Sequence, residues 1–157
     1  MKNELKQELT RRLCECNNGG LVLVMYDIYF GFSEDVKAAL ASNDRAALKK
    51  AVADVQAALD ELIGALDFKY PLAGQLYPLY SYCKRLFSTV LYSLDVSVVD
   101  EADVIMKKLR TSFETAAADD KSAPLMDNAQ KVYAGMTYGK GRLTESFIND
   151  DNRGFLA

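Results

Sequence analysis

Residues 44–66 read DRAALKKAVADVQAALDELIGAL, and this stretch decides the fold. Its apolar side chains recur at steps of four and three residues, the period of one face of an α-helix. Alanine and leucine dominate the stretch, and both favour helix. We therefore predict a helix that packs one face into a bundle. The inward positions are Leu48, Val52, Val55, Leu59, Leu62 and Leu66.

The preceding stretch, residues 20–41, is more apolar and less periodic. It follows the turn-forming residues 17–19, which suit a helix start. Residues 21–32 are apolar nearly all round, so periodicity alone also allows a strand. The stretch then continues amphipathically through residues 33–40. That continuation favours a helix.

Two more long helices are predicted towards the C-terminus, over residues 71–94 and 98–118. Pro71 suits a first helical turn, where its missing N–H costs nothing. Pro78 is expected either to kink this helix or to delay its start. Residues 1–16 predict a short additional helix through Leu5 and Leu9.

The predicted helices are joined by short links at residues 42–44, 67–70 and 95–97. Short links connect neighbours that run in opposite directions. The predicted fold class is therefore all-α, an antiparallel up-down four-helix bundle with a short N-terminal helix and a C-terminal tail. We expect residues 1–118 to form the bundle domain and residues 119–157 a partly irregular extension.

Composition excludes several classes of function. The chain of 157 residues has a formal net charge of −3, which argues against a nucleic-acid binder that neutralises phosphates. The longest apolar run, residues 21–32, is shorter than the roughly 18 residues of a membrane span. It also lacks the features of a signal peptide. These observations predict a cytoplasmic protein without membrane insertion.

The chain has three cysteines and no histidine. Without histidine, the commonest general base and the Ser-His and Cys-His pairs are absent. Cys14 and Cys16 form a C-x-C pair with no second pair to complete a zinc site, and Cys83 falls on an apolar stripe. The acidic residues Asp60, Glu61 and Asp103 fall on the polar sides of their helices. We expect no enzyme, no metal and no cofactor.

Aromatic residues exceed what one small core needs. A four-helix core hides about half of such rings, so the others must lie on an outer face or in a groove, as at protein-binding surfaces. Asp27 interrupts the most apolar run. It is either a carboxylate at the bundle rim, capped by a Lys, Arg or Tyr side chain, or a buried polar group that orients a partner. The aromatic set is Tyr26, Tyr29, Phe30, Phe32, Tyr77, Tyr80, Tyr82, Phe87 and Tyr92.

Two sequence blocks resemble one family. Residues 23–27 read LVMYD at the opening of a helix, and residues 66–68 read LDF. Residues 76–82 then read LYPLYSY, with Arg85 one turn on. Together these blocks are similar to the FliS-type flagellar secretion chaperones, over about residues 18–118.

The resemblance implies a cytosolic chaperone that binds the C-terminal segment of flagellin, prevents its premature polymerisation and delivers it to the export gate. The alternative is a non-enzymatic helical adaptor or regulatory module. A homo-oligomer is compatible with either interpretation. The residues expected at the partner surface, some of which must also serve the core, are Met25, Tyr26, Tyr29, Leu76, Tyr77, Tyr80 and Arg85.

The two ends depart from the family pattern. No tyrosine precedes Tyr26, and the tail is longer than the family core requires. Within the tail, residues 124–134 and 142–148 suit short helices. The tail is expected to fold over the flagellin groove or to dock on the export machinery, and a tail without fixed structure is the alternative.

Overall fold

The computed structural model describes residues 3–125, and every regular element among them is a helix. The helices are α1 (Asn3–Glu15), α2 (Asn18–Ala41), α3 (Arg45–Gly64), α4 (Pro71–Ser93) and α5 (Val96–Ala118). The predicted helical bundle is confirmed, with helix ends close to those expected. The expectations for residues 126–157 lie outside the described residues.

The helix starts follow from local hydrogen bonding. Asp44 caps α3, because its carboxylate accepts hydrogen bonds from the backbone N–H groups of Ala46 and Ala47 at 3.0 and 2.9 Å. Asp95 caps α5 in the same way through Ser97 N–H at 2.8 Å. Helix α4 starts at Pro71 and contains Pro78 within it, so Pro78 does not delay the helix start.

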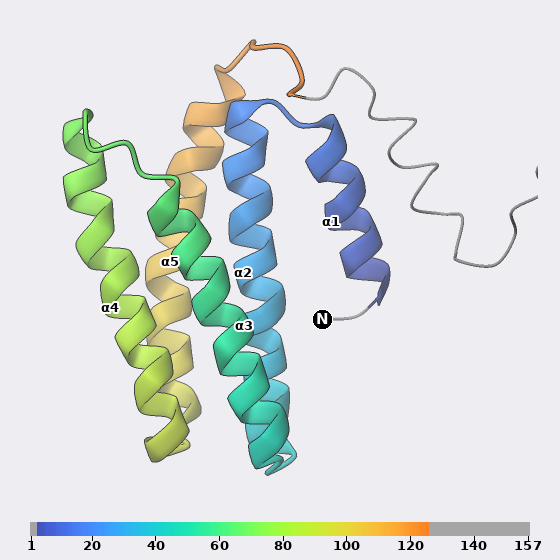
Figure 1. Ribbon diagram of the computed structural model, residues 1–157, viewed down its shortest axis with the longest axis vertical. Helices are drawn as coiled ribbons and strands as arrows, with labels where there is room; N and C mark the ends of the chain where they lie inside the picture. Colours follow the sequence, from blue (N-terminus) through green and yellow to red (C-terminus); the bar gives the residue numbers. More distant parts are fainter. Residues whose placement is uncertain (1–2, 126–157) are drawn as a thin grey trace, which may run out of the picture.

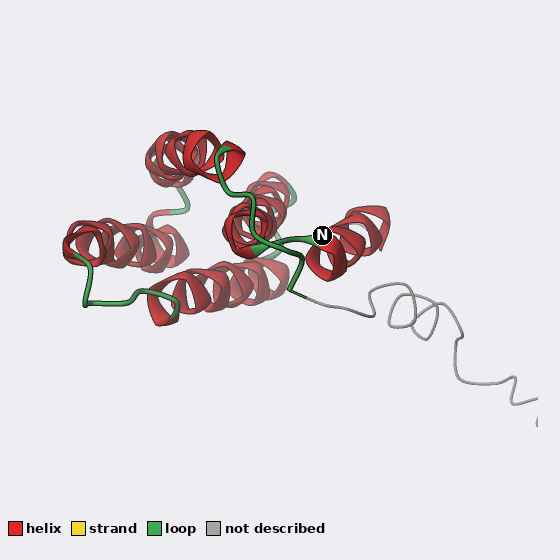
Figure 2. Cartoon of the chain, turned by 90° about the horizontal axis from the view of Figure 1, so that it is seen from above, coloured by secondary structure: helices red, strands yellow, loops and turns green. Residues whose placement is uncertain are grey.

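Helices α2 to α5 form a closed ring around one core. Helix α2 packs against α3 and α5, and α4 packs against the same two helices. Figure 1 shows the chain turning back along the preceding helix at each connection. Viewed from above (Figure 2), the four helices surround a common centre and α1 lies outside, against α2. The largest fully buried side chains are Tyr26, Tyr29, Leu59, Tyr80, Phe87 and Met106.

A close contact closes the ring where α5 ends beside the start of α2. Gly19 lies so near α5 that a Cβ there would meet the Cβ of Ala117 at 3.0 Å. The Asp120 carboxylate accepts a hydrogen bond from Gly19 N–H at 3.0 Å. A side chain at position 19 would require the neighbouring atoms to shift by a few tenths of an ångström, so glycine permits the close approach.

Between residues 3 and 125, no helix combines the length and the apolar character that a membrane crossing requires.

Candidate partner-binding surface

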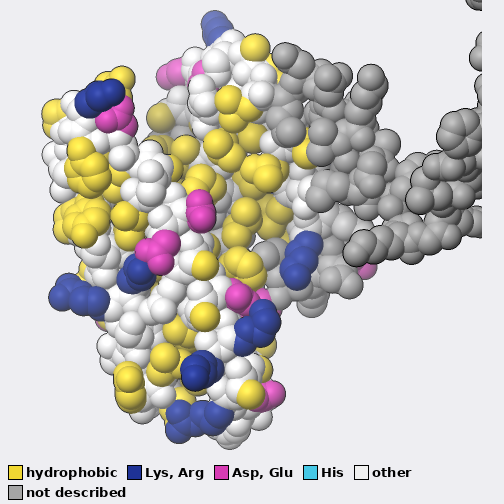
Figure 3. Space-filling view, in the orientation of Figure 1, with side chains coloured by type: hydrophobic (Ala, Val, Ile, Leu, Met, Phe, Trp, Pro, Cys, Tyr) yellow, Lys and Arg dark blue, Asp and Glu magenta, His cyan; other side chains and the backbone are white. Residues whose placement is uncertain are grey.

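Helix α2 carries more apolar surface than the ring can cover. Tyr26 and Tyr29 point into the core and are buried, and Val24 is buried outside that core cluster. Met25 and Ile28, on the adjacent face, are only partly buried. A helix that is apolar nearly all round needs cover on every side. Helix α1 covers one flank of α2, and the flank beside α3 stays partly open (Figure 3).

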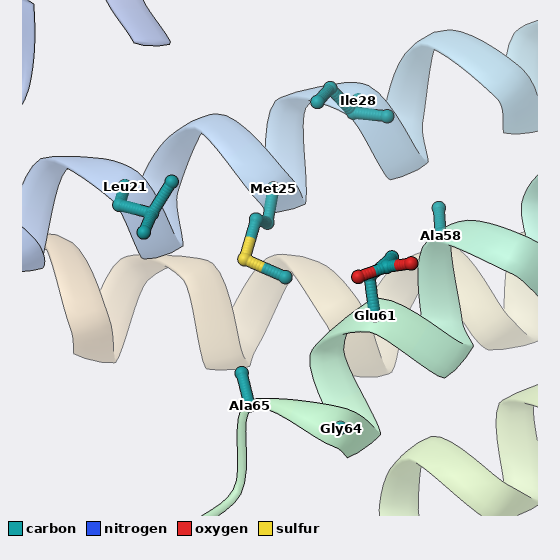
Figure 4. Close-up of a pocket in the computed structure, with 7 residues that line it drawn as sticks. All are labelled: Leu21, Met25, Ile28, Ala58, Glu61, Gly64 and Ala65. Atoms are coloured by element: carbon teal, nitrogen blue, oxygen red, sulfur yellow. The ribbon is translucent and has the colours of Figure 1, made fainter.

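An open groove of about 550 Å³ lies between α2 and α3. Figure 4 shows Met25 reaching from α2 into this space, opposite small residues of α3. Small side chains on α3 cannot fill the volume that faces the larger residues of α2, which is why the groove remains. We call it the α2–α3 groove, and its lining is Leu21, Met25, Ile28, Ala58, Glu61, Gly64 and Ala65.

A second cavity of about 270 Å³ lies where α3 turns into α4. It shares Met25 and Ala65 with the α2–α3 groove, so the two form one continuous apolar surface. We call it the corner pocket. Its lining residues are Val22, Met25, Leu62, Ala65, Leu66, Asp67, Tyr70, Leu72, Ala73, Leu76, Tyr80 and Phe113.

The turn beside the corner pocket presents aromatic rings to solvent. The Asp67 carboxylate accepts a hydrogen bond from Lys69 N–H at 3.0 Å, and the Asp67 carbonyl accepts one from Tyr70 N–H at 3.0 Å. This Asx-type turn is built by the Leu-Asp block. Phe68 beside it is 63% exposed and packs edge-on against Tyr77 at 6.0 Å between ring centroids. Exposed rings beside an apolar pocket are typical anchors of protein interfaces.

The seven residues expected at the partner surface divide into two groups. Tyr26, Tyr29 and Tyr80 are fully buried in the core. Leu76 is also buried, at 6% exposure, and it lines the corner pocket, as Tyr80 does. Met25 is partly buried and lines both cavities, Tyr77 is 46% exposed beside Phe68, and Arg85 is exposed further along α4.

Each buried tyrosine hydroxyl has a hydrogen-bond partner inside the core. The Tyr26 and Tyr80 hydroxyls share a hydrogen bond of 2.7 Å, and the Tyr29 hydroxyl donates to Asp103 Oδ1 at 3.0 Å. Burial raises the pKa of all three phenols, because a phenolate would lose its hydration there. The pairs keep these polar groups satisfied inside an apolar core.

Asp103 departs from the sequence prediction. It was expected on the polar side of its helix, yet it is only 9% exposed. Its carboxylate accepts hydrogen bonds from Tyr29 and from Ser33 at 2.8 Å, and Lys37 Nζ lies 2.8 Å from it. The expectation was wrong because three partners on α2 compensate the burial of the charge. No spacing within α5 signals partners on α2.

Asp27 fits the interpretation of a capped carboxylate at the bundle rim. It lies 2.7 Å from Arg12 of α1 and 2.8 Å from Arg110 of α5. One acidic residue in an apolar run therefore ties three helices together. It points away from the α2–α3 groove, towards a separate groove between α1 and α2 that has four charged lining residues.

Arg85 lies apart from both cavities. Its guanidinium sits 5.5 Å from the ring centroid of Tyr82, and the Tyr82 hydroxyl donates to Glu101 of α5. The cation–π contact lies within α4, and the hydrogen bond from Tyr82 joins α4 to α5. Among residues 3–125, no three Asp, Glu or Cys side chains come together as a metal site.

The family of the chain follows from comparison with known proteins. A family model described as flagellar protein FliS matches residues 1–120. The chain belongs to the FliS family. No curated protein matches it.

Membership in the FliS family confirms the resemblance drawn from the two sequence blocks. FliS is a chaperone family, which supports a flagellar export chaperone role, and the family implies flagellin as the partner. The match takes in the five helices found between residues 3 and 125, and it ends at Asp120, whose carboxylate accepts a hydrogen bond from Gly19 of α2.

Proposed function

We propose that this FliS protein binds the C-terminal segment of flagellin in the cytosol, on the surface formed by the α2–α3 groove and the corner pocket. The observation that carries the proposal is the continuity of this apolar surface, with exposed rings at its edge. Monomeric proteins rarely leave contiguous apolar surface open without a partner. The antiparallel order of the helices provides a rigid frame for it.

The chemistry of the surface suits a segment that folds on binding. An apolar groove between helices accepts an amphipathic helix through side chains spaced by three or four residues. Burying those side chains keeps them from other flagellin molecules, so the bound segment does not polymerise prematurely. Release then takes place at the export gate. Met25 and Tyr77 are the proposed anchors, with Leu76 beside them.

A paired substitution tests the site. Tyr77→Ala removes a half-exposed ring from the rim of the corner pocket and is expected to weaken binding of a flagellin C-terminal peptide about tenfold, roughly 1.4 kcal/mol. Tyr92→Ala is the matched control, because Tyr92 is 86% exposed near the other end of the same helix, whereas Tyr77 packs against Phe68 in the turn beside the corner pocket. Calorimetry measures both affinities, and circular dichroism checks that both variants fold.

The same titrations test the mode of binding. Coupled folding predicts a negative heat-capacity change and a gain in helicity. Equal losses in the two variants would contradict the proposed site. No binding by the unaltered protein at micromolar concentration would contradict the function and favour a helical adaptor for another partner.

A further inference from the structure

The chain leaves the bundle at the start of α2, next to the link between α1 and α2. After α5, Asp120 Oδ2 accepts a hydrogen bond from Gly19 N–H at 3.0 Å, and its carbonyl accepts one from Asn17 Nδ2 at 3.1 Å. Leu125 N–H then donates to the Cys16 carbonyl at 3.0 Å. These contacts hold the last described residue at the start of α2. Leu21, the first lining residue of the groove, follows Gly19 by two positions.

The groove has the properties of an acceptor for a short apolar segment. Leu21, Met25 and Ile28 form one wall at steps of four and three residues. Glu61 is its one charged lining residue, and among residues 3–125 no cation pairs with it. The groove between α1 and α2 has four charged lining residues, so it suits an apolar segment less well.

The sequence after Leu125 supplies such a segment. Residues 142–148 read RLTESFI and follow Gly139 and Gly141. Leu143 and Phe147 are four positions apart, a spacing that puts two side chains on one face of a helix. Arg142 precedes them with a positive charge, and Glu145 lies between them with a negative one. The pattern matches the groove in apolar spacing, and Arg142 supplies a charge opposite to that of Glu61.

The connecting chain has a suitable length. The sixteen residues 126–141 link Leu125 to the segment, and a flexible link of that size spans roughly 22 Å on average. The groove runs from Leu21 to Ile28, which is about 10 Å of helix. A flexible link whose mean span is about twice the length of the groove reaches all of it, and gives an effective concentration on the order of 1 mM.

We propose that residues 142–148 bind in the α2–α3 groove of their own chain, with Leu143 and Phe147 against Met25 and its neighbours and Arg142 towards Glu61. The segment thereby occupies part of the surface proposed for flagellin, and this competition, unlike the groove binding itself, rests on the proposed function. With an intrinsic Kd of about 0.1 mM the groove is filled in roughly nine of ten molecules. Flagellin affinity is then lowered about tenfold.

Methionine-methyl NMR on the full chain tests the groove binding without flagellin. Met25 lies in the groove, and Met106 in the core is the internal reference. The double change Leu143→Asp with Phe147→Asp is expected to shift the Met25 methyl resonance and leave Met106 unmoved. Phe155→Asp, in the same tail, is the control and is expected to move neither. An unmoved Met25 in the double variant, or an equal shift in the control, would overturn the proposal.

Two further measurements show which molecule supplies the bound segment and whether the segment competes with flagellin. A Met25 shift difference that disappears on dilution would mean that a second copy supplies the segment, and would overturn the intramolecular assignment. The double variant is expected to bind a flagellin C-terminal peptide about tenfold more tightly than the unaltered chain. Equal affinities would overturn the competition. If neither the unaltered chain nor the double variant binds flagellin, the proposed function fails. The Met25 methyl resonance still shows whether the tail occupies the groove.

Discussion

At the scale of single residues, buried hydroxyl pairs decide which tyrosines belong to the core. Tyr26 and Tyr80 come from different helices and share one hydrogen bond of 2.7 Å, with both rings buried. Tyr77 lies on the same helix as Tyr80, yet it is 46% exposed and packs only at the rim. A buried phenol requires a polar partner, and Tyr26 and Tyr80 supply one to each other inside the core.

The Tyr26–Tyr80 pair predicts a strongly non-additive double-mutant cycle. Tyr26→Phe or Tyr80→Phe alone leaves one buried hydroxyl unpaired and is expected to lower the free energy of unfolding by about 1–2 kcal/mol. The double variant removes both hydroxyls, so its loss is expected to be smaller than the sum of the two. Urea denaturation measures all three. Additive losses would show that the hydroxyls act independently.

At the scale of helices, α1 is attached differently from the rest. It packs against α2 and no other helix among those described, through the buried side chains of Leu9 and Cys14. The Arg12 guanidinium adds an ion pair to Asp27 at 2.7 Å. With so little buried surface, α1 is the element expected to open first.

Arg12→Ala is predicted to loosen α1 without changing the ring of helices. The change removes the ion pair that joins α1 to Asp27, which remains bound to Arg110 at 2.8 Å. Amide hydrogen exchange in α1 is expected to become faster, while exchange in α3 stays unchanged and global stability falls by at most about 1 kcal/mol. Lys6→Ala on the same helix is the control. Unchanged exchange in α1 would mean that apolar packing alone holds it.

At the scale of the whole molecule, the end of α5 and the start of α2 close the bundle. The Asp120 carboxylate bridges Ser122 N–H at 2.9 Å and Gly19 N–H at 3.0 Å. The close approach of Gly19 to Ala117 makes this junction compact. The same junction sets where the chain leaves the bundle.

The closure predicts a specific pH dependence. Hydrogen bonds from Ser122 and then Gly19 lower the pKa of Asp120 below the ordinary value of an aspartate. A lowered folded-state pKa means that the contribution to stability is present above the unfolded pKa and is lost as pH falls through the folded pKa. The amide proton shift of Gly19, followed by NMR, is expected to titrate with a midpoint below the ordinary pKa of an aspartate. Asp120→Asn should abolish this titration, and a midpoint at or above the ordinary value would contradict the assignment.

The sequence by itself determined the helices, the small core and the family. The stripe from Leu48 to Leu62 is a local pattern and becomes the buried face of α3, because a helix brings every third or fourth residue to one side. Capping is equally local, since Asp44 and Asp95 bond to N–H groups two or three positions later. The Leu-Asp and Leu-Tyr blocks were sufficient to indicate the FliS family before any contact was known.

Only the tertiary structure decided which residues form the surface. The sequence predicts Asp103 on the polar side of its helix, but the structure buries it. Its carboxylate accepts hydrogen bonds from Tyr29 and Ser33 and forms an ion pair with Lys37. These partners lie at least 66 positions away in the sequence. The aromatic blocks mark both core and rim, and burial separates Tyr80 from Tyr77. The groove exists because small residues of α3 face Met25 of α2, and such a mismatch of volumes between two helices appears in neither helix alone.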